Sequence, residues 1–207
     1  MESVREHFRK KASSFDDLYA EDRRFQRMLR PGLFARRELA AAVAGEFENP
    51  RVLDVGCGSG RVGEDVLEGG AAEYVGIDFS EPMLALAERR LERFGDRVRL
   101  VAADFLSAEL DGPFEVVLGL GLFDYTPEPE RFARRMHDMC SGAAVASFPR
   151  WNWLKGPVRK VRYEVLGDCP IFNYTERELR IMFGAAGFAR ADILPRGRTG
   201  YLVRAEA

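Results

Sequence analysis

The 207-residue chain has few of the residues that build metal centres and disulfide frameworks, with three cysteines and two histidines. Cys57, Cys140 and Cys169 match no zinc-binding spacing, so we expect no metal site. A sparse, odd number of cysteines is typical of reduced thiols, which predicts a cytoplasmic protein. No apolar run approaches the ~20 residues of a membrane span, and the polar N-terminus has no signal-peptide core.

An excess of basic over acidic residues is also lacking: the net charge is −2, whereas nucleic-acid-binding domains usually have a basic face. We therefore expect no nucleic-acid partner and a small molecule as the ligand. The hydrophobic content of 46% and the charged content of 31% are ordinary for a globular protein, and the length suits one well-buried domain. The oligomeric state is left open.

Strand-like and helix-like patterns alternate from residue 51 onward. Near-continuous apolar strands alternating with helices predict an α/β fold with a doubly wound, mostly parallel sheet. A C-terminal antiparallel hairpin, formed by Arg190–Leu194 and Tyr201–Arg204, brings the sheet to seven strands. Ser80 is expected to cap the helix that begins at Glu81, and Thr175 and Glu178 are expected to form a capping box at the start of the last helix. The other strands are predicted at Val52–Val55, Tyr74–Ile77, Val98–Ala102, Val116–Leu120 and Ala143–Phe148, and the helices at Arg61–Glu68, Glu81–Phe94, Pro129–Met139 and Thr175–Ala186.

The single domain, residues 1–207, divides into four predicted parts. Residues 1–48 are helical by periodicity, with a break at Pro31-Gly32, and form an N-terminal lid. Residues 49–148 form the core that binds the cofactor. Residues 149–174 fit no regular element and are predicted to lie on the substrate side, because such long connections are usually functional. Residues 175–207 hold the last helix and the hairpin.

The most informative motif is the glycine loop, residues 56–60, which follows the apolar strand ending at Asp54-Val55. Glycine lets the backbone turn sharply and lie against a ligand. Two more acids follow later strands: Asp78, about twenty residues on, is placed to hold both hydroxyls of a ribose, and Asp104 to accept from an adenine amino group.

A dinucleotide-binding enzyme is the main alternative, because Gly58, Gly60 and Gly63 satisfy the G-x-G-x-x-G spacing. Counted from Gly56, however, where the turn begins, the third position is Arg61. The acid Asp54 beside the loop also repels a pyrophosphate and suits an ammonium or sulfonium charge instead. The acids therefore favour a sulfonium nucleoside over NAD(P).

Together, Val52–Gly60, Gly76–Ser80, Ala103-Asp104-Phe105 and Phe114–Tyr125 resemble the class I, Rossmann-like S-adenosylmethionine-dependent methyltransferases that act on small molecules. The resemblance implies S-adenosylmethionine as cofactor and S-adenosylhomocysteine as product. It also implies the contacts: Gly56 and Gly58 at the methionine end, Asp54 acting nearby through the loop or water, Asp78 on the ribose, Phe79 and Phe105 flanking the adenine, Asp104 at its amino group, and the Leu120 backbone at the ammonium, with Cys57 and Met83 as further cofactor contacts.

Methyl transfer by in-line displacement needs neither a metal nor a covalent nucleophile, although an O, N or C nucleophile can require a base. A non-catalytic S-adenosylmethionine-binding protein is a further alternative. Aromatic and basic side chains near the site suit an aromatic or carboxylated substrate. The candidate bases are Tyr125, where relatives often have histidine, Asp124, Tyr19 and His7, and the candidate substrate contacts are Phe123, Arg150, Trp151, Trp153 and Tyr174.

Overall fold

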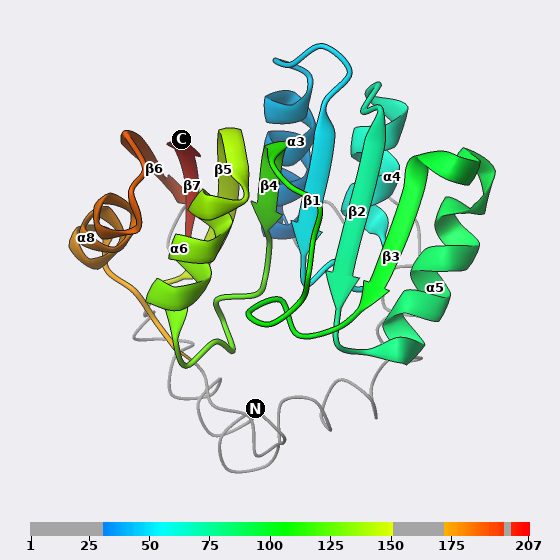
Figure 1. The fold of residues 1–207 in the computed structure, drawn as a ribbon. Helices are drawn as coiled ribbons and strands as arrows, with labels where there is room; N and C mark the ends of the chain where they lie inside the picture. The colour runs from blue at the N-terminus through cyan, green and yellow to red at the C-terminus, as the bar shows by residue number, and fades with distance from the viewer. Residues whose placement is uncertain (1–30, 151–171, 197–199) are drawn as a thin grey trace.

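The computed structural model describes residues 31–150, 172–196 and 200–207. Helices and strands alternate along these residues, as the sequence pattern predicts (Figure 1). The strands are β1 (Arg51–Val55), β2 (Glu73–Asp78), β3 (Val98–Ala102), β4 (Phe114–Gly119), β5 (Cys140–Pro149), β6 (Arg190–Arg196) and β7 (Gly200–Glu206), and the helices are α3 (Pro31–Ala44), α4 (Arg61–Glu68), α5 (Glu81–Leu91), the 3-10 helix η1 (Glu92–Arg97), α6 (Pro129–Asp138) and α8 (Glu176–Ala186).

The seven strands form one sheet in the order β3-β2-β1-β4-β5-β7-β6. Strands β1 to β5 pair in parallel, and β7 runs antiparallel to both β5 and β6, which confirms the predicted fold class. The chain moves outward from β1 to β3 and then returns to place β4 beside β1. The carboxyl ends of β1 and β4 therefore flank the point where the strand order reverses, where open α/β sheets bind ligands.

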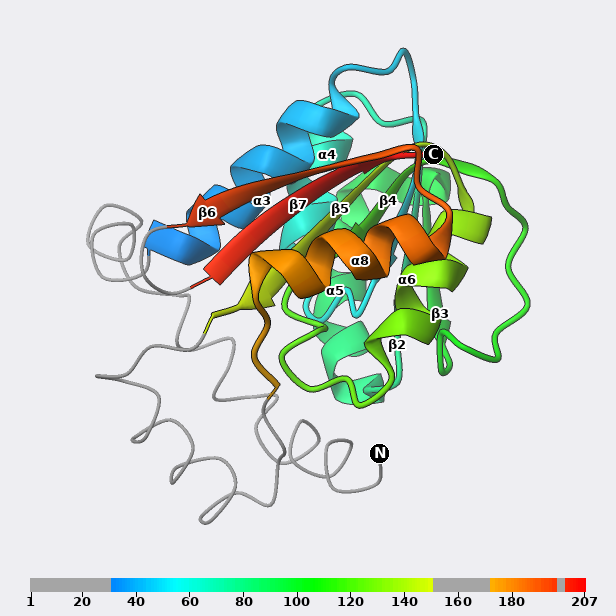
Figure 2. The same ribbon diagram turned by 90° about the vertical axis from the view of Figure 1, so that its left-hand side faces the viewer.

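Helices cover both faces of the sheet (Figures 1 and 2). On one face α6 and α8 bury Met136, Leu179 and Phe183 against the strands. On the other, α3, α4 and α5 pack Val43, Val66 and other apolar side chains against the sheet. Burial on both faces explains the near-continuous apolar strands.

Several local predictions are confirmed and others shift. Helix α8 has the full capping box: Glu178 N–H donates to Thr175 Oγ1 at 3.3 Å, and Thr175 N–H donates to the Glu178 carboxylate at 2.7 Å. Ser80 precedes α5 as predicted, but its side chain makes no capping bond. Strand β4 ends at Gly119, so Leu120 begins the following loop.

Candidate functional site

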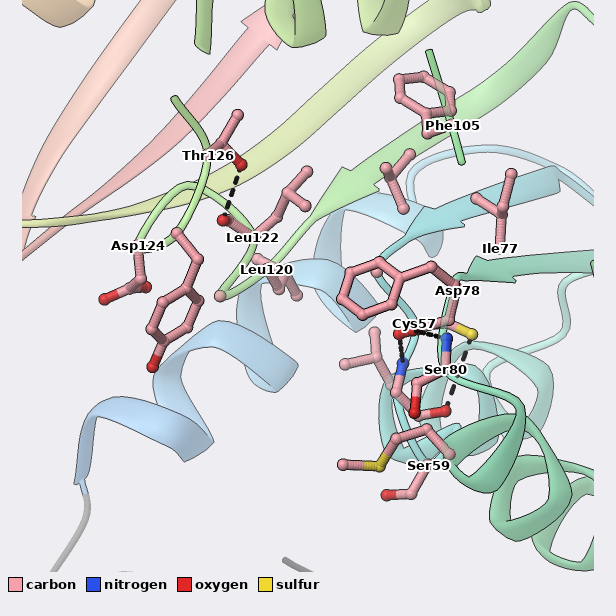
Figure 3. A pocket seen from close by; sticks show the side chains of 18 of the residues that line it. Cys57, Ser59, Ile77, Asp78, Ser80, Phe105, Leu120, Leu122, Asp124 and Thr126 are labelled. Carbon is pink, nitrogen blue, oxygen red and sulfur yellow. Dashed lines mark hydrogen bonds between the residues drawn. The ribbon is translucent and has the colours of Figure 1, made fainter. Parts of the chain in front are cut away.

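A cavity of about 370 Å³ opens at the carboxyl ends of β1, β2 and β4. Figure 3 shows Cys57, Asp78 and Ser80 on one side of it, and Leu120, Leu122 and Asp124 on the other. The two sides come from the glycine loop with the start of α5, and from the loop between β4 and α6. The sequence-predicted residues on its wall are Gly56, Cys57, Gly58, Asp78, Phe79, Met83, Asp104, Phe105, Leu120, Asp124 and Tyr125.

The glycine loop folds back onto the end of β2. Gly56 N–H donates to the carbonyl of Ile77 at 2.8 Å, and Gly56 and Gly58 have φ values of 72° and 53°. Residues that have a side chain rarely adopt these backbone angles, so glycine is needed for the loop to take this shape. The loop residues Gly56, Cys57, Gly58 and Ser59 line one wall of the cavity.

The Asp78 carboxylate joins the glycine loop to the start of α5. Its Oδ2 accepts Gly58 N–H and its Oδ1 accepts Ser80 N–H, each at 2.9 Å. Burial raises the pKa of this carboxyl, while the backbone donors, Ser80 N–H first, act in the opposite direction. Each carboxylate oxygen has a second acceptor position left over from these bonds, so the group has acceptor capacity for two hydroxyls at the cavity wall.

Asp54 lies beneath the glycine loop and does not line the cavity. Its side chain is 2% exposed, and Tyr74, which is fully buried, donates its hydroxyl to Asp54 Oδ2 at 2.8 Å. Burial raises the pKa of Asp54 to about 7, the Tyr74 hydrogen bond opposes this rise, and the charge of Asp78 adds to it. Asp54 therefore stays off the cavity wall, and its action on a ligand through the loop or water stays a prediction.

The Tyr74 ring explains Gly63, the third glycine of the dinucleotide-like spacing. A Cβ added at Gly63 would lie 2.5 Å from Tyr74 Cζ, so α4 approaches β2 closely only because position 63 has no side chain. Gly63 does not line the cavity. Helix–strand packing therefore explains the glycine at position 63.

The region of the cavity around Phe79 and Phe105 is largely apolar. Phe79, Met83 and Phe105 line it, and Phe105 is also part of the core, with its ring centroid 5.8 Å from that of Phe132. Asp104 Oδ1 accepts Leu106 N–H at 2.9 Å, which holds the turn after β3. The predicted adenine contacts Phe79, Asp104 and Phe105 thus all line the cavity.

Sequence reasoning missed Arg36, on the first turns of α3. Its guanidinium lies 3.9 Å from the Asp124 carboxylate, and both residues line the cavity. Arg36 Nε is buried and has no hydrogen-bond partner among the residues that the structure describes. The neighbouring Arg37 is held by two hydrogen bonds to Asp65. Two adjacent arginines in a helix whose only other charged residue is Glu38 were the available signal.

Three predicted substrate contacts lie away from the cavity wall. Phe123 is fully buried, with its ring centroid 4.3 Å from that of Phe148. Tyr174 donates its hydroxyl to the Phe123 carbonyl at 3.2 Å, and the exposed Arg150 lies over the Tyr201 ring. His7, Tyr19, Trp151 and Trp153 lie outside the described residues, as do most of the predicted lid and of residues 149–174.

Within residues 31–150, 172–196 and 200–207, no group of three or more His, Cys, Asp or Glu side chains is arranged to hold a metal ion. No helix in these ranges is long and apolar enough to cross a membrane.

Comparison with known proteins gives the same picture for the core. Residues 52–142 match the family described as "Methyltransferase domain". The ubiquinone biosynthesis O-methyltransferase of Bordetella parapertussis is 34% identical over 110 residues, which cover 52% of this chain and 43% of that protein. The corresponding enzyme of Pseudomonas aeruginosa is 35% identical over 89 residues. The chain spans about two fifths of the length of these curated relatives.

Solved structures share the fold across nearly the whole chain. The magnesium protoporphyrin IX methyltransferase of Synechocystis PCC 6803, solved with SAH, has a TM-score of 0.76 at 20% identity, covering 98% of this chain and 97% of that one. The 1,6-didemethyltoxoflavin-N1-methyltransferase of Burkholderia thailandensis has a TM-score of 0.71 at 20% identity, covering 99% and 87%.

The family match falls on the glycine loop and the three acids, while the structural likeness extends the same sheet order to the hairpin. Residues 52–142 thus match a methyltransferase domain, and the described residues share the fold of solved methyltransferase structures.

Proposed function

We propose that the chain binds S-adenosylmethionine in the cavity and transfers its methyl group to a small-molecule O, N or C nucleophile. The observation that carries the proposal is the Asp78 carboxylate, fixed by two backbone N–H groups at the cavity wall. Its remaining acceptor positions suit the two hydroxyls of a ribose. The match of residues 52–142 to a methyltransferase family supports the same ligand.

The other residues on the wall fit the remaining parts of this ligand. Phe79, Met83 and Phe105 give an apolar environment for the adenine, with Asp104 beside them. On the Asp124 side, the Arg36 guanidinium supplies positive charge for a carboxylate, and its buried Nε has a donor to offer. Ser80 Oγ is likewise buried without a partner in the described chain. These groups match a nucleoside that also bears an amino acid.

When bound, the cofactor supplies a methyl group on a sulfonium sulfur that becomes neutral as the methyl group leaves. The chain's own residues then act by alignment and by exclusion of water. Val55, Ile77 and Leu122 give the cavity apolar walls. Asp124 and Tyr125 are the described candidates for taking a proton from the nucleophile, and Asp124 is held by its ion pair with Arg36.

The proposed substrate is an aromatic or carboxylated small molecule rather than a nucleic acid. The relatives are named for ubiquinone biosynthesis, magnesium protoporphyrin IX and 1,6-didemethyltoxoflavin. The division into a lid (1–48), a core (49–148), a substrate-side segment (149–174) and a C-terminal part (175–207) stays a prediction, with the lid and the segment proposed to complete the substrate site. The free thiols of Cys57 and Cys140 agree with the proposed cytoplasmic location.

Two measurements test this proposal against its alternatives. Thermal unfolding is expected to shift upward with S-adenosylmethionine or S-adenosylhomocysteine and not with NAD(P). Transfer of a labelled methyl group to members of a panel of phenols, quinols and carboxylated heterocycles is then expected. Stabilisation by NAD(P) alone would indicate an oxidoreductase, and cofactor binding without transfer to any metabolite or extract would indicate a non-catalytic binding protein.

A further inference from the structure

A serine hydroxyl is buried inside the sheet beside the proposed site. Ser147, on β5, is 0% exposed, and its Oγ accepts Gly121 N–H at 2.8 Å. Ser147 does not line the cavity, whereas the buried polar residues Ser80, Asp124 and Thr126 do. Burying a hydroxyl is costly unless it is hydrogen-bonded, so this bond is the reason that the position can be polar.

The bond fixes the orientation of one peptide group at the cavity. Strand β4 lies between β1 and β5, so Gly121, just beyond its end, directs its N–H toward β5. In a trans peptide the preceding carbonyl points the opposite way. The Leu120 carbonyl is therefore directed toward the β1 side, where the glycine loop and the cavity lie (Figure 3).

Residue 121 is a glycine, and without the bond to Ser147 it would let this peptide rotate. Gly121 has a φ of 83°, and a Cβ there would lie 3.1 Å from Arg36 Nη1. Glycine satisfies both requirements, but it also lowers the barrier to other backbone conformations. The Ser147 hydroxyl supplies the restraint that a side chain at residue 121 cannot.

We propose that Ser147 is a positioning residue that aims the Leu120 carbonyl into the cavity, where it accepts a hydrogen bond from the cofactor's ammonium group. This inference rests on the proposed function. Replacing Ser147 by alanine leaves the partly buried Gly121 N–H without this partner, and the peptide between Leu120 and Gly121 then turns to find another. The Leu120 carbonyl then no longer points into the cavity, while the ribose and adenine contacts on the far side of the cavity are unchanged.

Calorimetric titration with three ligands isolates this effect. S-adenosylhomocysteine carries the ammonium and the carboxylate, its decarboxylated analogue keeps only the amine, and 5′-methylthioadenosine has neither. Ser147→Ala is expected to weaken the first two by about tenfold, the worth of one ordinary hydrogen bond, and the third by less than twofold. Ser141→Ala, at an exposed position on the same strand, is the matched control and is expected to change none of them.

Equal losses for all three ligands, or unchanged affinity for S-adenosylhomocysteine, would overturn the role of Ser147. Loss for S-adenosylhomocysteine alone, with the decarboxylated analogue unaffected, would overturn it as well, since that pattern belongs to Arg36. If the alanine variant does not fold, Ser147→Cys keeps the volume and a weaker acceptor, and the same split at smaller size is expected. Wild-type protein that binds none of the ligands would instead refute the proposed function.

Discussion

Asp54 is expected to make the domain less stable as the pH rises. Its pKa is about 7 in the folded protein against an ordinary value of 3.8, so between these values the folded state holds a proton that the unfolded chain has lost. Stability therefore falls from about pH 4 to about pH 7 and levels off above. The difference, about 3 pH units at about 1.4 kcal/mol each, corresponds to about 4 kcal/mol.

Asp54→Asn removes the ionisation and keeps an oxygen that accepts the Tyr74 hydroxyl. The variant is expected to exceed the wild type by about 1 kcal/mol at pH 4.5 and by about 4 kcal/mol at pH 8. Urea unfolding from pH 4.5 to 8.5 measures this difference. Asp78, whose pKa is also raised by burial, is present in both proteins and contributes equally to both curves.

Tyr74→Phe is the matched second variant, because it removes only the hydroxyl that favours the ionised form. It is expected to raise the pKa of Asp54 further, so its deficit against the wild type grows as the pH rises. If the stability curves of Asp54→Asn and the wild type run parallel across this range, Asp54 does not ionise near pH 7 and the reasoning is refuted.

Three further changes test the packing and the site. Gly63→Ala forces a Cβ into the Tyr74 ring and is expected to lower the free energy of unfolding in urea by about 1–3 kcal/mol. Gly184→Ala in α8, where a Cβ meets nothing within 4 Å, is the control and is expected to be neutral or slightly stabilising. Equal effects of the two substitutions would contradict the packing account. Thr175→Ala loses the capping box of α8 and is expected to cost about 1 kcal/mol. Arg36→Ala is expected to weaken S-adenosylhomocysteine, but not 5′-methylthioadenosine, in calorimetry; equal weakening of both would show that the arginine does not bind the carboxylate.

The sequence predicted a seven-stranded, mostly parallel sheet with a C-terminal hairpin because apolar strands and capped helices leave local signals. Thr175 with Glu178 predicted the start of α8, and the glycine loop and Asp78 predicted where the cavity would lie. These features depend on residues close together in the chain, whose backbone requirements are visible in the residue types themselves.

Contacts between distant residues were not predictable in the same way. Tyr74 gives no sign in the sequence that it binds Asp54, or that its ring is the reason for Gly63. Phe123 looked like a substrate contact from its place after β4, but side-chain direction puts it in the core against Phe148. Arg36 reaches the cavity only because α3 packs across the sheet, which no local pattern reveals.

The central claim is that Asp78 holds the ribose of S-adenosylmethionine at the end of β2. Calorimetric titration of S-adenosylhomocysteine into the wild type and into Asp78→Ala tests it most directly. One site per chain is expected for the wild type, with at least about tenfold weaker binding in the variant, because charge-assisted bonds to two hydroxyls are lost. Equal affinity of the two proteins, or no binding to the wild type, would contradict the account.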